Sequence, residues 1–245
     1  IYAPGRRSAP SEILLPCVPS EFELLEETLS SKLLVPESGD RRRMLDFGCE
    51  NARAALTKQS DEEQRDEDAL EQLVELLDLD PATEVIDCFD ISTTQGANVV
   101  ASRVRFRRGH ADRAGYRRYK IREVDGQDDF ASMHEVVRRS LERGMRENDL
   151  PDLVVIDGGQ PQLARALEAR QEAGAFGGAM VGLAKARAER KVRGRRKGPV
   201  EERVWIPGAE AAIELGAHSA VRHLLERIRD EAHRFAITSH RKARG

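Results

Sequence analysis

One stretch constrains the fold more than any other: an apolar run at residues 85–91, interrupted only by Asp87 and Asp90. A short run of this kind is typical of a strand buried on both faces, at the centre of an α/β sheet. A second such run, at residues 153–157, ends in Asp157 directly before two glycines. The sequence therefore predicts two central strands that each bring a carboxylate to the place where the strand ends.

Hydrophobic periodicity predicts that strands and helices alternate through the rest of this region. In chain order they are a hairpin at 99–106 and 116–121, helices at 128–146 and 163–173, a strand at 180–184, a basic loop at 185–197, an edge strand at 205–207 and a helix at 219–240. This order matches an RNase H-like mixed sheet, in which the first and fourth strands lie side by side and parallel. Adjacent strands are about 4.8 Å apart, so Asp90 and Asp157 should face each other.

The first 80 residues show a different pattern. Short strands are predicted at 13–16 and 33–36 with a helix at 21–31 between them, followed by helices at 40–58 and 61–78. The second of these last two helices is acidic at its start, and Pro81 closes the segment. We therefore expect an α/β protein with two domains. Residues 1–80 form an extension that packs on the catalytic core, and residues 81–245 form the RNase H-like domain with flanking helices.

Composition limits the location and the partners of the chain. The net charge is −3 over 245 residues, so any basic surface must be local. Cys17, Cys49 and Cys88 lack the spacing of metal ligands and are expected to be buried free thiols in a reducing compartment. No apolar run approaches the roughly 20 residues of a membrane span, so we expect a cytoplasmic protein. The first residue is Ile1 rather than Met, which suggests a fragment.

The two aspartates suit metal-dependent phosphodiester hydrolysis. Hard cations held by carboxylates activate water and neutralise the charge that develops on a phosphate, and Mg²⁺ needs only one or two carboxylates. Each aspartate also has an ordinary explanation, since Asp157 precedes Gly158 and Gly159 as a turn or cap residue would. Two such residues on neighbouring strands are harder to explain in that way.

The terminal helix adds polar residues away from its apolar stripe. Glu226, Arg229, His233 and His240 share a face that we expect to be exposed. His233 is a candidate metal ligand or a general acid or base. Arg229 is a candidate for holding a phosphate or for pairing with Glu226, and the sequence does not choose between them.

Several strings together resemble the UvrC family, a bacterial excinuclease subunit of nucleotide excision repair, in its C-terminal endonuclease half. Each string is weakly informative alone, but all of them occur in order. They lie at residues 12–16, 35–43, 50–56, 88–92, 95–102, 116–121, 128–133, 151–159 and 223–237.

The resemblance implies an RNase H-like endonuclease that uses Mg²⁺ or Mn²⁺ to cut DNA 5′ to a lesion. The catalytic residues of the family fall on Asp90, Asp157, His233 and Asp129, of which the first three would hold metal. From the residues alone, Asp129 is interpreted as a helix N-cap. The implied partners are damaged double-stranded DNA, UvrB and, through UvrB, UvrA. Nothing in residues 1–245 resembles the GIY-YIG nuclease or the helix-hairpin-helix motifs of the family.

DNA contacts are expected from Arg117, Arg118 and Arg229, because phosphate contacts need cations but carry no sequence information. Thr93 stands where the family usually has His, and Gln160-Pro161 stands where it usually has Lys-Gly. A glutamine there would weaken a phosphate contact, for which the basic loop at 185–197 is a possible compensation. Two alternatives stay open: a DNA-binding scaffold of the same fold without catalysis, and another RNase H-like nuclease that acts on hybrids or junctions.

Overall fold

The computed structural model describes residues 10–93, 99–124, 128–185 and 202–242. All but the first residue of the predicted basic loop at 185–197 lies outside these ranges. The chain divides into two units, Ile1–Glu62 and Glu63–Gly245. Within the described ranges, no helix combines the length and the apolar character that crossing a membrane requires.

The first unit is small. Two parallel strands, β1 (Glu12–Leu14) and β2 (Lys32–Leu34), flank the helix α1 (Phe22–Leu29), as the sequence predicted. The three cysteines of the chain are free, but only Cys88 is buried, while Cys17 is exposed. The expectation that all three are buried is therefore wrong, because this small unit buries few side chains. Whether residues 1–80 pack as an extension on the core stays a prediction.

A single helix replaces the two that were predicted at 40–58 and 61–78. Helix α2 runs without a break over Gly39–Leu76. No Gly or Pro lies between the two predicted helices, and Lys58 pairs with Glu62 at 3.7 Å across the expected break. Pairs of this i,i+4 kind favour a continuous helix. The last turns of α2 belong to the second unit, where Leu70 and Leu73 are buried in its core.

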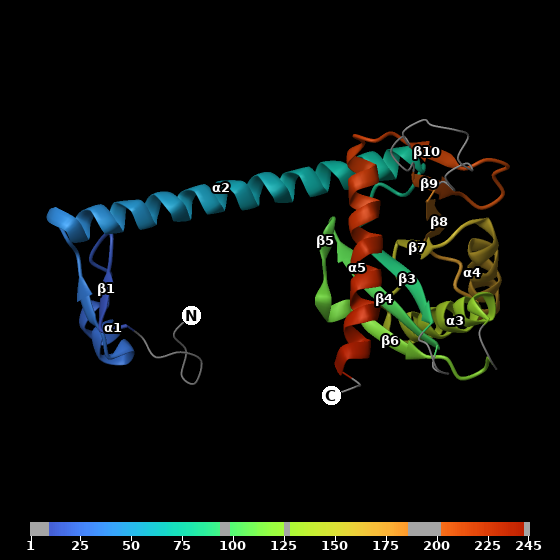
Figure 1. Ribbon diagram of the computed structural model, residues 1–245, viewed down its shortest axis with the longest axis horizontal. Coiled ribbons are helices and arrows are strands. Elements are labelled where there is room, and N and C mark those ends of the chain that lie inside the picture. Colours follow the sequence, from blue (N-terminus) through green and yellow to red (C-terminus); the bar gives the residue numbers. More distant parts are fainter. Residues whose placement is uncertain (1–9, 94–98, 125–127, 186–201, 243–245) are drawn as a thin grey trace, which may run out of the picture. The chain divides into compact units, whose positions relative to one another are not determined.

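The second unit is built on an eight-stranded mixed sheet (Figure 1). Its strand order is β10-β9-β8-β7-β3-β4-β5, with β6 also paired to β4. The two predicted central strands, β3 and β7, are adjacent and parallel, which confirms the expected arrangement. The strands are β3 (Val85–Thr93), β4 (Val99–Arg107), β5 (His110–Ala111), β6 (Arg117–Lys120), β7 (Leu153–Asp157), β8 (Ala179–Lys185), β9 (Glu202–Trp205) and β10 (Ile213–Leu215).

The far end of the sheet differs from the prediction of an edge strand at 205–207. Strand β9 ends at Trp205 and lies between β8 and β10, so it is internal. Pro207 has no backbone N–H to donate, which is consistent with the strand ending before it. The short strand β10 was not predicted, because three residues show too little periodicity.

Helices cover both faces of the sheet (Figure 1). Helices α3 (Asp129–Glu147) and α4 (Gln160–Ala173) pack on one face, and α5 (Ala220–Lys242) packs with the end of α2 on the other. Alternation along β3 decides which side chain meets which layer. Cys88 belongs to the core beneath α5, whereas Phe89 belongs to the core beneath α3 and α4.

The α3 side of the sheet holds a buried network of charges. Arg105 donates two hydrogen bonds to Asp87, at 2.7 and 2.9 Å, and Arg103 lies 3.3 Å from the same carboxylate. Arg105 also pairs with Asp149, which follows α3 in the chain. Asp87, the first carboxylate in the apolar run, therefore joins β3 to β4 and has no part in the site on the opposite face.

Candidate active site

Asp90 and Asp157 lie next to each other on adjacent strands. The last registered pair of β3 and β7 is Phe89 with Ile156, so the following pair is Asp90 with Asp157. Two residues before each aspartate, Cys88 and Val155 face the core beneath α5, and alternation places both aspartates on that face. Strand β7 ends at Asp157 as predicted, whereas β3 continues for three residues beyond Asp90.

The charges of the two aspartates oppose each other. Burial, and then the charge of Asp90, raise the pKa of Asp157 to about 6, although the charges of Arg229 and His233 act to lower it. Within the described residues, the side chain of Asp157 has no hydrogen-bond or ion-pair partner. Asp90 is only 6% exposed. A half-buried carboxylate without a partner, next to a second carboxylate, is an environment that favours a bound cation.

His233 projects from α5 beside Asp90. Its Nδ1 atom lies 3.8 Å from Oδ2 of Asp90, and its side chain is 61% exposed. This separation is too long for a hydrogen bond. The helical turn that carries His233 is fixed to the sheet, because Ser102 on β4 donates a hydrogen bond of 3.1 Å to the carbonyl of Ala232. Ser102 is also the registered partner of Asp90 in the sheet. Ser102 therefore connects the part of the sheet that carries Asp90 to the helical turn that carries His233.

These observations bring together three of the four predicted catalytic residues. No group of three or more His, Cys, Asp and Glu side chains in the described ranges could hold a metal ion as it stands. A cation at this site would therefore rest on Asp90 and Asp157 and complete its shell with water, as Mg²⁺ often does. The role of His233 as a third ligand stays a prediction.

Asp129, the fourth residue, lies at the start of α3 and is exposed. The interpretation of Asp129 as the N-cap is wrong by one residue. Asp128 is the cap and accepts hydrogen bonds from the backbone N–H groups of Phe130 and Ala131, each at 3.0 Å. Two consecutive aspartates are equally good cap candidates by residue type, so the sequence could not choose between them. The catalytic role of Asp129 stays a prediction.

Arg229 is buried, which corrects the expectation that it shares an exposed face with His233. Only 7% of Arg229 is exposed, and its Nη1 atom donates to Glu202 of β9 at 2.6 Å. Its predicted alternative partner, Glu226, pairs instead with Arg222 at 2.9 Å. Little of the Arg229 guanidinium remains accessible to a phosphate. Sequence reasoning missed Glu202, although its position two residues before the buried Val204 placed it on the inner face.

Arg117 and Arg118 point to opposite faces of β6. Arg118 is registered with Ser102, the partner of Asp90, so the three lie in one row across the sheet on the α5 face. Its guanidinium stacks on Phe235 of α5, 4.4 Å from the ring centre, and the residue is exposed. Arg117 is registered with the buried Arg103, which faces α3. Of these two predicted DNA contacts, only Arg118 lies on the same face as the aspartates.

The departures from the family pattern lie close to the aspartates along the chain. Thr93 is the last residue of β3, three residues after Asp90. Gln160 begins α4, and Pro161 occupies its first turn, where proline is well tolerated. The side chain of Gln162 accepts a hydrogen bond of 3.1 Å from the N–H of Gly159 and thereby caps the helix. The turn that follows Asp157 is thus well ordered without a lysine.

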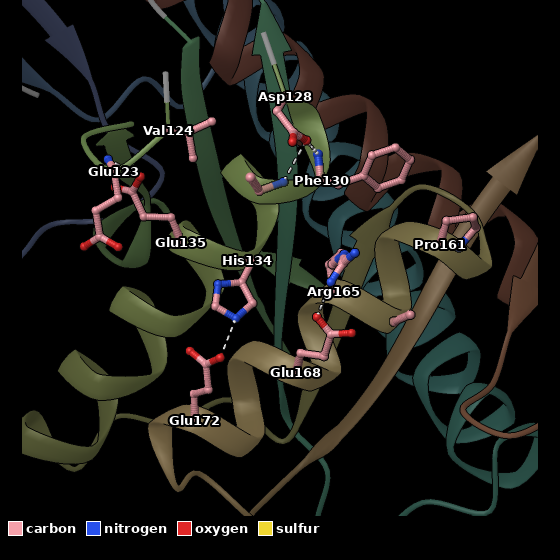
Figure 2. Close-up of a pocket in the computed structure, with 12 residues that line it drawn as sticks. Glu123, Val124, Asp128, Phe130, His134, Glu135, Pro161, Arg165, Glu168 and Glu172 are labelled. Carbon is pink, nitrogen blue, oxygen red and sulfur yellow. Dashed lines mark hydrogen bonds and ion pairs between the residues drawn. The ribbon is translucent and has the colours of Figure 1, made fainter. Parts of the chain in front are cut away.

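A groove of about 860 Å³ lies elsewhere, between α3 and α4 (Figure 2). It is mainly acidic, and two of its basic side chains are already paired: His134 lies 3.3 Å from Glu172, and Arg165 lies 2.6 Å from Glu168. This groove is on the face of the sheet opposite to Asp90. The groove is therefore separate from the pair formed by Asp90 and Asp157.

Comparison with known proteins decides the family. The family description "UvrC RNAse H endonuclease domain" matches residues 74–237, and "UvrC Ribonuclease H-like domain" matches residues 1–59. The chain belongs to the UvrC family. The first match covers most of the sheet unit, so the predicted RNase H-like α/β fold is confirmed together with the family.

Curated UvrC relatives match almost the whole chain. UvrABC system protein C of Syntrophotalea carbinolica is 39% identical, and that of Geobacter metallireducens is 40% identical, each over 96% of this chain. The chain spans about 40% of the length of these relatives. A solved structure of Ciona intestinalis endonuclease V with DNA covers 66% of the chain at 12% identity and a TM-score of 0.41, which is too low to support an argument.

Proposed function

We propose that this part of a UvrC protein is a metal-dependent DNA endonuclease, which makes the incision 5′ to a lesion within the UvrABC system. The observation that carries the proposal is the pair of neighbouring carboxylates, Asp90 and Asp157, with His233 beside them. The UvrC relatives support the repair context, since they are named as members of that system.

The proposed cofactor is Mg²⁺ or Mn²⁺, held by Asp90 and Asp157. The residues fit such an ion, because the Asp157 carboxylate has no partner among the described residues and its pKa is raised to about 6 by burial and the Asp90 charge. A bound cation would supply charge neutralisation at the phosphate and an activated water. By holding the cation in a fixed position, both aspartates would also orient the substrate phosphate that the cation attracts.

The proposed role of His233 is to move a proton or to complete the metal shell. Its exposed ring is 3.8 Å from Asp90, and it can therefore reach a solvent molecule or a leaving oxygen at the site. Arg118 is the proposed phosphate contact, because it is exposed on the same face and in the same row of the sheet as Asp90. Arg117 and Arg229, the other predicted DNA contacts, are less suited: one faces α3 and the other is buried.

The proposed substrate is damaged double-stranded DNA, and the proposed partners are UvrB and, through it, UvrA. An enzyme of this kind needs no base-specific contacts, since it is directed by the lesion complex rather than by sequence. The net charge of −3 is consistent with a local contact to the phosphate backbone and with reliance on partners for affinity.

Nicking of a lesion-containing duplex by the full-length protein, with UvrA, UvrB and Mg²⁺, tests the proposal. Asp90→Asn and His233→Ala should each lower 5′ nicking roughly 10²-fold or more. Asp46→Asn, an exposed change on α2, is the matched control and should nick normally. Unchanged 5′ nicking in Asp90→Asn would instead support the alternative of a scaffold without catalysis. Wild-type nicking that needs no UvrB would support the other RNase H-like nuclease.

A further inference from the structure

Arg229 and Glu202 form a buried ion pair on the same face of the sheet as the aspartates. Nη1 of Arg229 lies 2.6 Å from Oε2 of Glu202, and the two side chains are 8% and 3% exposed. The pair joins α5 to β9, because Arg229 lies on the helix and Glu202 is the first residue of the strand. Arg229 is one helical turn before His233. Burying two charges is unfavourable unless they are well paired, so the pair calls for an explanation.

The pair lies near Asp157 without binding it. Asp157 is registered with Leu183 on β8, and two residues further along that strand Lys185 is registered with Glu202. Burial alone would lower the pKa of Arg229, but the hydrogen bond and charge of Glu202, followed by the charge of Asp157, raise it. Arg229 and Asp157 thus act on each other by charge, yet no ion pair joins them in the described part of the chain.

An arginine that interacts by charge with a carboxylate, where that carboxylate has no partner among the described residues, needs a restraint. Guanidinium groups bind carboxylates strongly, often through two parallel hydrogen bonds, and the arginine side chain is long and flexible. A contact between Arg229 and Asp157 would occupy the oxygens that a cation needs. Glu202 supplies a competing carboxylate in a fixed position on β9.

We infer that Glu202 is a positioning residue that anchors Arg229 beside Asp157 and thereby keeps the Asp157 oxygens open to a divalent metal. This inference rests on the proposed metal-dependent function and adds two residues to it. It also assigns Arg229 a role that its burial allows, in place of the phosphate contact that the sequence predicted.

Binding of Mn²⁺ to this chain, measured by isothermal titration calorimetry, tests the inference. Glu202→Gln releases Arg229 toward Asp157 and should weaken Mn²⁺ binding about 10- to 100-fold. Arg229→Gln removes the competing cation and should bind Mn²⁺ at least as tightly as wild type. The double variant Glu202→Gln, Arg229→Gln should recover the affinity that Glu202→Gln loses. If the ion pair were only structural, Glu202→Gln and Arg229→Gln would weaken Mn²⁺ binding to a similar extent. The double variant would then not regain the affinity that Glu202→Gln loses.

Controls separate the possible outcomes. Arg227→Gln removes an exposed ion pair of the same helix with Asp66 and should bind Mn²⁺ normally. Near-ultraviolet circular dichroism reports folding, and should Glu202→Gln fail to fold, Glu202→Asp keeps the charge, moves the anchor and should give an intermediate loss. Wild-type affinity in a folded Glu202→Gln or Glu202→Asp, or an equal loss in Arg229→Gln, overturns the anchoring role alone. Absence of Mn²⁺ binding by wild type overturns the metal site and the anchoring role with it.

Discussion

The carboxylates of Asp90 and Asp157 repel each other whenever both are ionised, and burial strengthens the repulsion. The pKa of Asp157 in the folded chain, about 6, lies above its ordinary value of 3.8. The folded state therefore binds the proton more tightly than the unfolded state does, and stability falls as pH rises from about 3.8 to 6. Above about pH 6, Asp157 is ionised in both the folded and the unfolded state, and the folded state is then destabilised by the whole cost of burying this charge next to Asp90.

Replacing Asp157 by a neutral residue should therefore stabilise the protein, although it removes a ligand of the proposed metal site. We predict that Asp157→Asn raises the free energy of unfolding at pH 8 by about 1–3 kcal/mol, and that the gain shrinks toward zero near pH 4. Urea unfolding of the variant and of wild type at both pH values measures the difference. Asp46→Asn, on the surface of α2, should change little at either pH. Equal or lower stability of Asp157→Asn at pH 8 contradicts the charge repulsion.

Residues differ in how well the sequence predicts their surroundings. Asp90 and Asp157 were located because each interrupts or ends an apolar run, and the parallel pairing of β3 with β7 makes them neighbours. Arg229 was misplaced, because its partner Glu202 lies on a strand whose bounds were wrongly predicted. Charged pairs buried across elements depend on tertiary structure, which helical spacing along one element does not reveal.

At the scale of elements, strand β6 distinguishes two neighbouring arginines by face. Arg118→Ala should weaken DNA binding and reduce the salt slope of the binding constant by about one unit, because one phosphate contact is lost. Arg117→Ala is the matched control, since its side chain belongs to the row that faces α3. Fluorescence anisotropy with a labelled duplex over a series of KCl concentrations measures both. An equal effect of the two variants contradicts the assignment of Arg118.

The pairing of β3 with β4 depends on the charge network around Asp87. Arg105→Met leaves Asp87 buried with only Arg103, and we predict a loss of about 3–5 kcal/mol in the free energy of unfolding. Arg108→Met removes a solvent-exposed pair with Glu84 and should change the free energy of unfolding much less. Urea unfolding compares the two, and losses of similar size would show that the network adds no particular stability.

Elements were predicted best where their pattern was long and strong. The central strands are nearly continuous apolar runs and the terminal helix has a marked apolar stripe, and their types and order are confirmed. The break predicted in α2 is wrong, because the helix continues through the junction, where Lys58 pairs with Glu62. Strand β10 escaped prediction because its pairing with β9 is decided by the sheet rather than by its own three residues.

At the scale of the whole molecule, the chain corresponds to only part of each curated relative. It spans about 40% of the length of its curated relatives, and its 245 residues carry a net charge of −3. The site itself holds two carboxylates that repel DNA unless a cation neutralises them. The proposed metal dependence and the proposed reliance on partners therefore rest on the same charge distribution.

The most direct test isolates the cut that this region is proposed to make. A lesion-containing duplex that already carries the 3′ nick is given to the full-length protein with UvrA and UvrB, and 5′ nicking is measured as Mg²⁺ is titrated. We predict nicking that rises with Mg²⁺ in wild type and is almost absent at every Mg²⁺ concentration in Asp157→Asn. Wild-type nicking in the presence of a chelator, or normal nicking by Asp157→Asn, would contradict this prediction.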